Sequence, residues 1–167
     1  IGTTGASLAT TLVFVGFAIG GVGVGHLADR WGRRKILFVG CSVASCVIAA
    51  LLMLSAVEPT WLTIILLAAL GVTTGGQSLA FVMTADFAAR HTRGVQLAFV
   101  NFIVMILPVA VQPGVGYLAG IGVSANNLPS ATQELRGYAL VVGLMMAGTL
   151  IACFVRETKP QHDAGPK

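Results

Sequence analysis

Charged residues divide the chain into long uncharged intervals. Asp, Glu, Lys and Arg are absent from residues 1–28, 36–57, 59–85, 94–133 and 137–155. A helix that crosses about 30 Å of hydrocarbon needs roughly 20 predominantly apolar residues. Every interval except 94–133 has the length of one crossing. The pattern therefore predicts a membrane-crossing helix in each interval.

The interval 94–133 is too long for one crossing and too short for two crossings with a turn. Its second part, "IGVSANNLPSATQ", is rich in Gly, Ser, Asn and Pro, which is typical of a loop. We therefore predict five spans, at about 4–26, 36–56, 61–84, 95–119 and 137–155. The predicted fold class is all-α, a polytopic transmembrane helical bundle over residues 1–156 with a tail at 157–167.

Composition supports a membrane protein. Hydrophobic residues make up 56% of the chain and charged residues only 10%, whereas a soluble domain is about 25% charged. A transmembrane β-barrel is excluded, because its strands are about ten residues of alternating polarity and these apolar runs are continuous. Ile1 falls inside or at the edge of the first span, which favours a fragment of a longer chain.

The basic residues identify the two sides of the membrane. Loops 27–35 and 85–94 and the tail after residue 155 carry nine of the ten Lys and Arg residues, and the other side carries only Arg136. Loops rich in Lys and Arg stay on the cytoplasmic side. We therefore expect both loops and the tail to be cytoplasmic, in a bacterial-type inner membrane. This asymmetry accounts for the net charge of +4 without a nucleic-acid partner.

The first basic loop has an unusual pattern, "GHLADRWGRRK", in which glycines stand at fixed distances from an acid and several bases. Gly25 allows close approach of backbones at a helix end, and Gly32 permits the backbone conformation of a tight turn. Arg33, Arg34 and Lys35 can anchor the loop at the membrane edge. That anchoring role does not explain an acid at position 29.

This loop resembles the signature loop of the major facilitator superfamily, which has the pattern G-x-x-x-D-R/K-x-G-R/K-R/K-R/K. The resemblance implies twelve helices in two six-helix halves that alternate access to a central cavity. It also implies that Asp29 faces a helix N-terminus of the opposite half. The neighbouring Arg30 is expected to pair with an acid at the cytoplasmic end of a nearby helix, and Asp86 resembles that acid. The conformational latch motif implied in this way comprises Gly25, Asp29, Arg30, Gly32, Arg33, Arg34 and Asp86.

Either half of such a transporter could contain this chain, and we favour helices 8–12 of the second half. A complete signature favours the first half of such a transporter. Helices 8–12 of the second half are favoured by the tail residues 157–159, which resemble the segment after the last helix. They are also favoured by a third span without a membrane-embedded Arg, and by Asn101 followed by "VQPGVGYL" in the fourth span.

Polar residues inside the spans are candidates for the substrate path, because such residues tend to face a partner helix or a wet cavity. We expect Gln77, Asn101 and Gln112 to line the cavity; the alternative is that they hydrogen-bond between helices. Pro108 and Pro113 are expected to break the fourth helix, and broken helices mark binding sites in transporters. The resemblance implies that the second and fifth spans face outward.

Small and weakly polar residues have simpler interpretations. Gly16 and Gly20 form a small-xxx-small face suited to close helix packing. Hydroxyl groups on one face of the first span either bond within their own helix or line the cavity; they belong to Thr3, Ser7, Thr10 and Thr11. The three cysteines fall inside spans and are expected to pack as small apolar residues; they are Cys41, Cys46 and Cys153.

No nucleophile–base pair, phosphate loop or metal-ligand spacing is evident, so we expect neither an enzyme nor a cofactor or metal. The predicted function is secondary active transport of a small polar solute, with or without a coupling proton or ion. The expected partners are that solute, the lipid bilayer and the N-terminal half of the same transporter. The alternative is a scaffold or sensor with the same fold and no transport activity.

Overall fold

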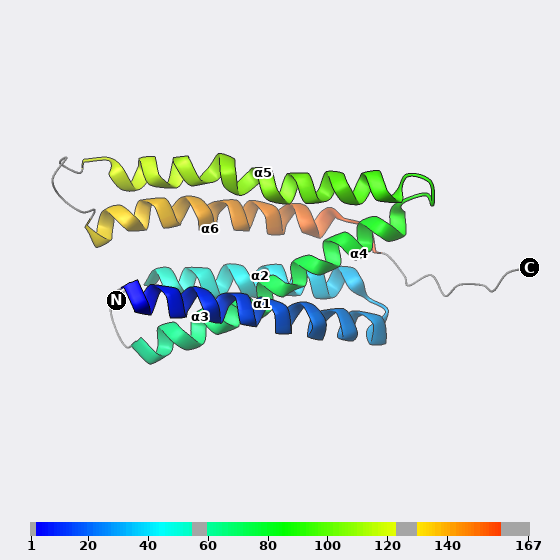
Figure 1. Cartoon of the computed structure of the whole chain (residues 1–167), viewed down its shortest axis with the longest axis horizontal. Coiled ribbons are helices and arrows are strands. Elements are labelled where there is room, and N and C mark those ends of the chain that lie inside the picture. The colour runs from blue at the N-terminus through cyan, green and yellow to red at the C-terminus, as the bar shows by residue number, and fades with distance from the viewer. Residues whose placement is uncertain (1–2, 55–59, 123–129, 158–167) are drawn as a thin grey trace, which may run out of the picture.

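The computed structural model describes residues 3–54, 60–122 and 130–157 (Figure 1). The described residues form helices and contain no strand. In chain order the elements are α1 (Thr3–Trp31), α2 (Arg34–Leu54), α3 (Thr60–Thr74), the 3-10 turn η1 (Gly75–Gln77), α4 (Ser78–Phe87), α5 (Arg93–Gly120) and α6 (Ala131–Phe154). The all-α prediction is confirmed.

Among the described residues, five segments are long and apolar enough to cross a membrane. By length and hydropathy, the segments able to span a membrane are Ser7–Trp31, Arg34–Leu54, Trp61–Phe87, Arg93–Gly120 and Gln133–Phe154. The third combines α3, η1 and α4. Helices α1, α2, α4 and α5 run two to five residues further toward the basic loops than predicted, because a helix retains its hydrogen bonds in the interfacial region as well. Most of the predicted tail, residues 158–167, lies outside the described residues.

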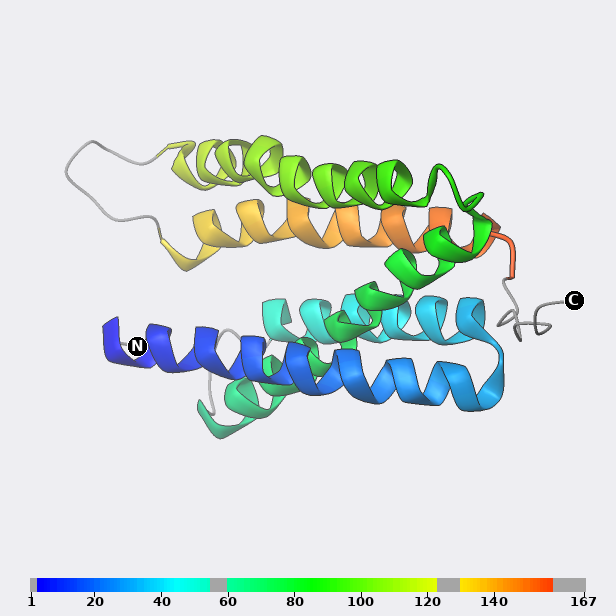
Figure 2. The ribbon, with the colours of Figure 1, turned by 45° about the vertical axis from the view of Figure 1, so that its right-hand side comes forward.

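The bundle has two groups of helices, which are connected by contacts between α2 and α6 and by α4. Helices α1, α2 and α3 form one group and α5 and α6 the other, and α4 runs diagonally from the first group to the second (Figures 1 and 2). Helices α2 and α6, far apart in sequence, pack side by side. In the part of the chain that the structure describes, the backbone of α5 approaches those of α4 and α6 and does not come as close to that of α1.

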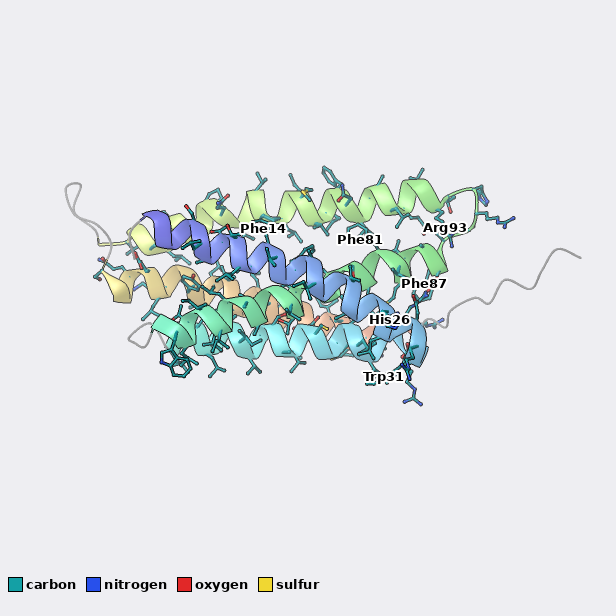
Figure 3. The ribbon with its side chains drawn as sticks, turned by 60° about the horizontal axis from the view of Figure 1, so that its bottom comes forward. Phe14, His26, Trp31, Phe81, Phe87 and Arg93 are labelled. Carbon is teal, nitrogen blue, oxygen red and sulfur yellow. The ribbon has the colours of Figure 1, made fainter. Side chains whose placement is uncertain are left out.

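The basic residues gather at one end of the bundle. Helices α1, α4 and α6 end there and α2 and α5 begin there, and we call this the basic end. Trp31, Phe87 and Arg93 lie at it (Figure 3). Trp61 and Tyr138 lie near the opposite end, with 62% and 57% of their surfaces exposed. Exposed aromatic residues at both ends of a bundle are typical of the two membrane–water interfaces.

Helix α1 packs against α3 and η1 through a seam of glycines, which we define as Gly16, Gly20, Gly71 and, in η1, Gly75. A Cβ atom added at Gly16 would lie 2.7 Å from the carbonyl oxygen of Ala68. Cβ atoms at the other seam glycines would overlap the backbone of the facing helix as well. The small-xxx-small prediction for Gly16 and Gly20 is therefore confirmed: these helices approach at backbone distance because side chains are absent.

The break in a helix occurs in a different span from the one expected. Helix α5 continues through Pro108 and Pro113, whereas the third span changes to a 3-10 turn at Gly75–Gln77. Just before this turn the Thr74 hydroxyl donates to the carbonyl oxygens of Leu70 and Gly71, each at 2.9 Å. Hydroxyl bonds to preceding carbonyls and consecutive glycines both weaken regular helix geometry.

Weakly polar side chains connect α2 to its neighbours. Ser45 donates to Thr73 on α3 at 2.9 Å, and the Cys46 sulfur lies 3.5 Å from the Thr149 hydroxyl on α6. Such bonds between membrane helices contribute about 0.6 kcal/mol each on average. On α1, Thr11 donates to the Ser7 carbonyl at 2.9 Å, which is the own-helix alternative. The side chain of Thr3 lies outside the described residues.

Candidate functional site

The turn between α1 and α2 reverses the chain within two residues. Gly32 has a φ of 63°, a left-handed conformation that costs L-residues with a side chain roughly 1–2 kcal/mol. Its backbone N–H donates to the Ala28 carbonyl at 2.9 Å, which closes the end of α1. Arg34 then starts α2. The turn therefore holds the end of α1 and the start of α2 close together at the basic end.

Arg34 is a buried cation between two acids. The residue is 7% exposed, and its Nη2 donates to Asp29 Oδ1 at 3.1 Å. Its Nη1 forms a shorter ion pair with Asp86 Oδ2, at the end of α4. Within the described residues the Nε of Arg34 has no hydrogen-bond partner. A buried charge persists only where opposite charges compensate its lost hydration, and both acids compensate Arg34.

The two acids differ in exposure. The Asp86 side chain is 16% exposed, whereas that of Asp29 is 70% exposed. Asp86 therefore depends on Arg34 for its compensation, since little water reaches it. Asp29 uses one oxygen for Arg34 and keeps most of its carboxylate surface open.

The arginine that pairs with Asp86 differs from the expected one. The resemblance implied Arg30, but the structure places Arg34 in this position, and Arg30 and Arg33 are exposed. The reason is geometric. Arg30 belongs to the last turn of α1, whereas the left-handed Gly32 turns the chain so that the first residue of α2 faces the end of α4.

A further acid reaches the turn from the end of α6. Glu157 Oε1 accepts the backbone N–H of Lys35 at 3.0 Å. The first N–H groups of a helix lack partners within the helix, and a carboxylate is favourable there. We predicted no contact for Glu157 from the sequence, although it is an acid directly after the last span. Through Glu157 the end of α6 is tied to the start of α2.

The turn between α4 and α5 is held independently of these acids. Arg93 Nε donates to the Ala85 carbonyl at 3.0 Å. This bond fixes the start of α5 against the last turn of α4, next to Asp86. The ends of all five spans therefore meet in a hydrogen-bonded cluster at the basic end.

The predicted cavity residues are all exposed, but the structure does not bring them together. Gln77 lies in η1, and Asn101 and Gln112 lie on α5. In the described part of the chain, η1 does not contact α5. Asn101 and Gln112 are eleven residues apart and share one face of their helix. No group of three or more His, Cys, Asp or Glu able to hold a metal ion occurs among the described residues.

We expect Gly32→Ala to lower the free energy of unfolding by about 1–2 kcal/mol, because alanine is strained in the left-handed region. Thermal unfolding of the purified protein in detergent measures the change. Gly23→Ala is the matched control, since a Cβ atom there would meet nothing within 4 Å and alanine favours a helix interior. Equal unfolding temperatures for Gly32→Ala and wild type would show that the turn does not need glycine.

Comparisons with known proteins agree with this architecture. The family model described as Major Facilitator Superfamily matches residues 1–167. The chain is similar to Solute carrier family 22 member 2 of Oryctolagus cuniculus, with 34% identity over 103 residues, 59% of this chain and 18% of that protein. Its similarity to Solute carrier family 22 member 2 of Mus musculus is 32% over 105 residues, 60% of this chain and 19% of that protein. The chain thus spans under a fifth of these relatives' length. No solved structure matches it significantly.

Proposed function

Because the chain belongs to the major facilitator superfamily, we propose that it forms part of a secondary active transporter that moves a small polar solute by alternating access. The observation that carries this proposal is that Arg34 of the family's signature loop is buried between Asp29 of the same loop and Asp86 of α4. These ion pairs hold together helix ends at the basic end of the bundle. Interface ion pairs of this kind can form in one conformation of a protein and break in another.

The proposed membrane is a bacterial-type inner membrane, with the basic end on its cytoplasmic side. The distribution of Lys and Arg supports this orientation. We assign α1, α2, the α3–η1–α4 segment, α5 and α6 to helices 8–12 of the transporter. The proposed partner is then the N-terminal half of the same protein. This assignment rests on the features of the tail, the third span and the fourth span.

Within the latch, the three charged residues have different proposed roles. Arg34 neutralises Asp86 and fixes Asp29 through one oxygen. Asp29, with its side chain 70% exposed, is the group able to reach outside this bundle. We propose that it meets a helix N-terminus of the other half in one conformation only. Such a difference in contacts is what allows a group to shift a conformational equilibrium.

The proposed substrate path uses Gln77, Asn101 and Gln112. Two observations support this proposal: α5 has no buried residue, and its backbone does not pack closely against that of α1. Exposed faces of α5 are therefore left for the second wall of a cavity. Uncharged amides bind neutral or polar solutes through hydrogen bonds. A coupling proton or ion would find its titrating group in the other half.

A panel of polar solutes offered to the full-length protein in proteoliposomes tests the function. We expect saturable uptake of at least one solute, and Asp29→Asn to lower its initial rate about tenfold, a usual size for coupling between conformations. Arg90→Gln is the control, because this exposed cation lies at the same end outside the motif. Absence of any uptake would favour the scaffold or sensor. Unchanged uptake by Asp29→Asn would exclude the latch role alone.

A further inference from the structure

A groove runs along the seam between α2 and α6 at the basic end. We define the α2–α6 groove by its lining residues, Lys35, Ile36, Val39, Gly40 and Cys153, and its volume is about 430 Å³. This volume is within the range of small-molecule binding sites. Gly40 keeps the groove open, since a Cβ atom there would meet nothing within 4 Å.

The groove lining is apolar apart from Lys35, which lies at the basic end of the bundle, and we call this end the mouth. Lys35 is the second residue of α2 and lines the mouth, whereas Gly40 lies five residues, about 7.5 Å, deeper in the membrane. Arg33 and Arg156, which are close in sequence to Lys35 and Glu157, are exposed. The nearby acid Glu157 is engaged by the Lys35 backbone N–H. Lys35, Arg33 and Arg156 outnumber Glu157 three to one, so these four residues carry a net positive charge. In the described part of the chain no carboxylate forms an ion pair with the Lys35 ammonium.

We propose that the α2–α6 groove binds one anionic phospholipid, with its phosphate at Lys35 and an acyl chain along Val39 and Gly40. Basic pockets between membrane helices recognise anionic headgroups in this way. A second copy of the chain is a poorer occupant. Copies inserted in one orientation would bring their positive mouths together at the same depth, and like charges repel. An anionic lipid supplies both the opposite charge and the apolar chain.

Native mass spectrometry of the purified full-length protein tests this site. The probes are phosphatidylglycerol and phosphatidylcholine with identical acyl chains. We expect preferential retention of phosphatidylglycerol, lowered about fivefold by Lys35→Gln, which is the effect of one basic side chain at an anionic surface. Lys35→Arg should keep the preference. Gly40→Leu fills the groove and should lower retention of both lipids.

Two matched controls separate the groove from general effects. Arg90→Gln removes a cation from the same end of the bundle, outside the groove. Gly148→Leu adds the same bulk to α6 at an open position about 140° around the helix from Cys153. Neither should change lipid retention, and elution as a single species verifies folding of each variant.

Three results would overturn the proposal. The first is equal retention of the two lipids by the wild type. The second is unchanged retention of phosphatidylglycerol by Lys35→Gln. This result is sufficient to overturn the proposal even if Gly40→Leu does not fold. The third is an oligomer that holds no lipid and that Gly40→Leu dissociates, because the groove would then be an interface between copies. Each result is independent of whether the protein transports a solute.

Discussion

Replacing Arg34 with methionine is expected to destabilise the bundle by about 3–5 kcal/mol, the usual effect of removing one partner from a buried ion pair. Methionine fills most of the space but leaves Asp86, only 16% exposed, without a compensating charge. Asp29 would lose its connection to α2 as well. Thermal unfolding of the purified protein in detergent measures the loss of stability.

The exposed neighbour Arg33 provides the control. Arg33→Gln removes a charge from the same turn, and we expect it to change stability by less than about 0.5 kcal/mol, as surface substitutions usually do. The double variant Arg34→Met/Asp86→Leu should recover much of the loss, because it removes both charges of the pair. A loss in the double variant equal to the sum of the two single losses would show that the residues do not interact.

Substituting Gly20 with alanine is expected to lower stability by about 1–3 kcal/mol, the usual effect of overpacking a close contact. The added Cβ atom would overlap the backbone of Val72, and α1 would have to move away from α3. The sign is informative, because alanine in place of glycine inside a helix otherwise adds roughly 0.5–1 kcal/mol of stability. Unfolding temperatures in detergent, together with the fraction of protein that elutes as a single species, measure the effect.

Gly23→Ala, on the same helix but in open space, should raise the unfolding temperature or leave it unchanged. The two substitutions add the same atom to α1 and differ only in what that atom meets. If both variants were equally stable, the glycine seam would not determine the distance between α1 and α3. Gly16→Ala should behave like Gly20→Ala, because its Cβ atom would lie 2.7 Å from the Ala68 carbonyl oxygen.

Only one side of the glycine seam could be predicted from the sequence. The spacing of Gly16 and Gly20 was enough to predict a close-packed face on α1. It did not reveal that Gly71 and Gly75 lie opposite, because helix spacing locates a face on one helix and not its partner on another. The prolines of α5 were a misleading signal for a broken helix. Proline is tolerated in membrane helices where neighbouring groups satisfy the backbone.

The amino-acid sequence by itself determined the number of crossings, the end of the bundle where basic residues gather, the family and the residues of the signature loop. These properties depend on hydrophobic length and charge distribution, which are local along the chain. Only the tertiary structure decided that Arg34 joins Asp29 to Asp86, that Glu157 meets the start of α2, and that α2 and α6 form a groove with a cationic mouth. Arg34 and Asp86 are separated by 52 positions in the sequence, and Lys35 and Glu157 by 122. Helices α2 and α6 are likewise far apart in the sequence. Packing geometry creates such contacts, and no local pattern encodes them.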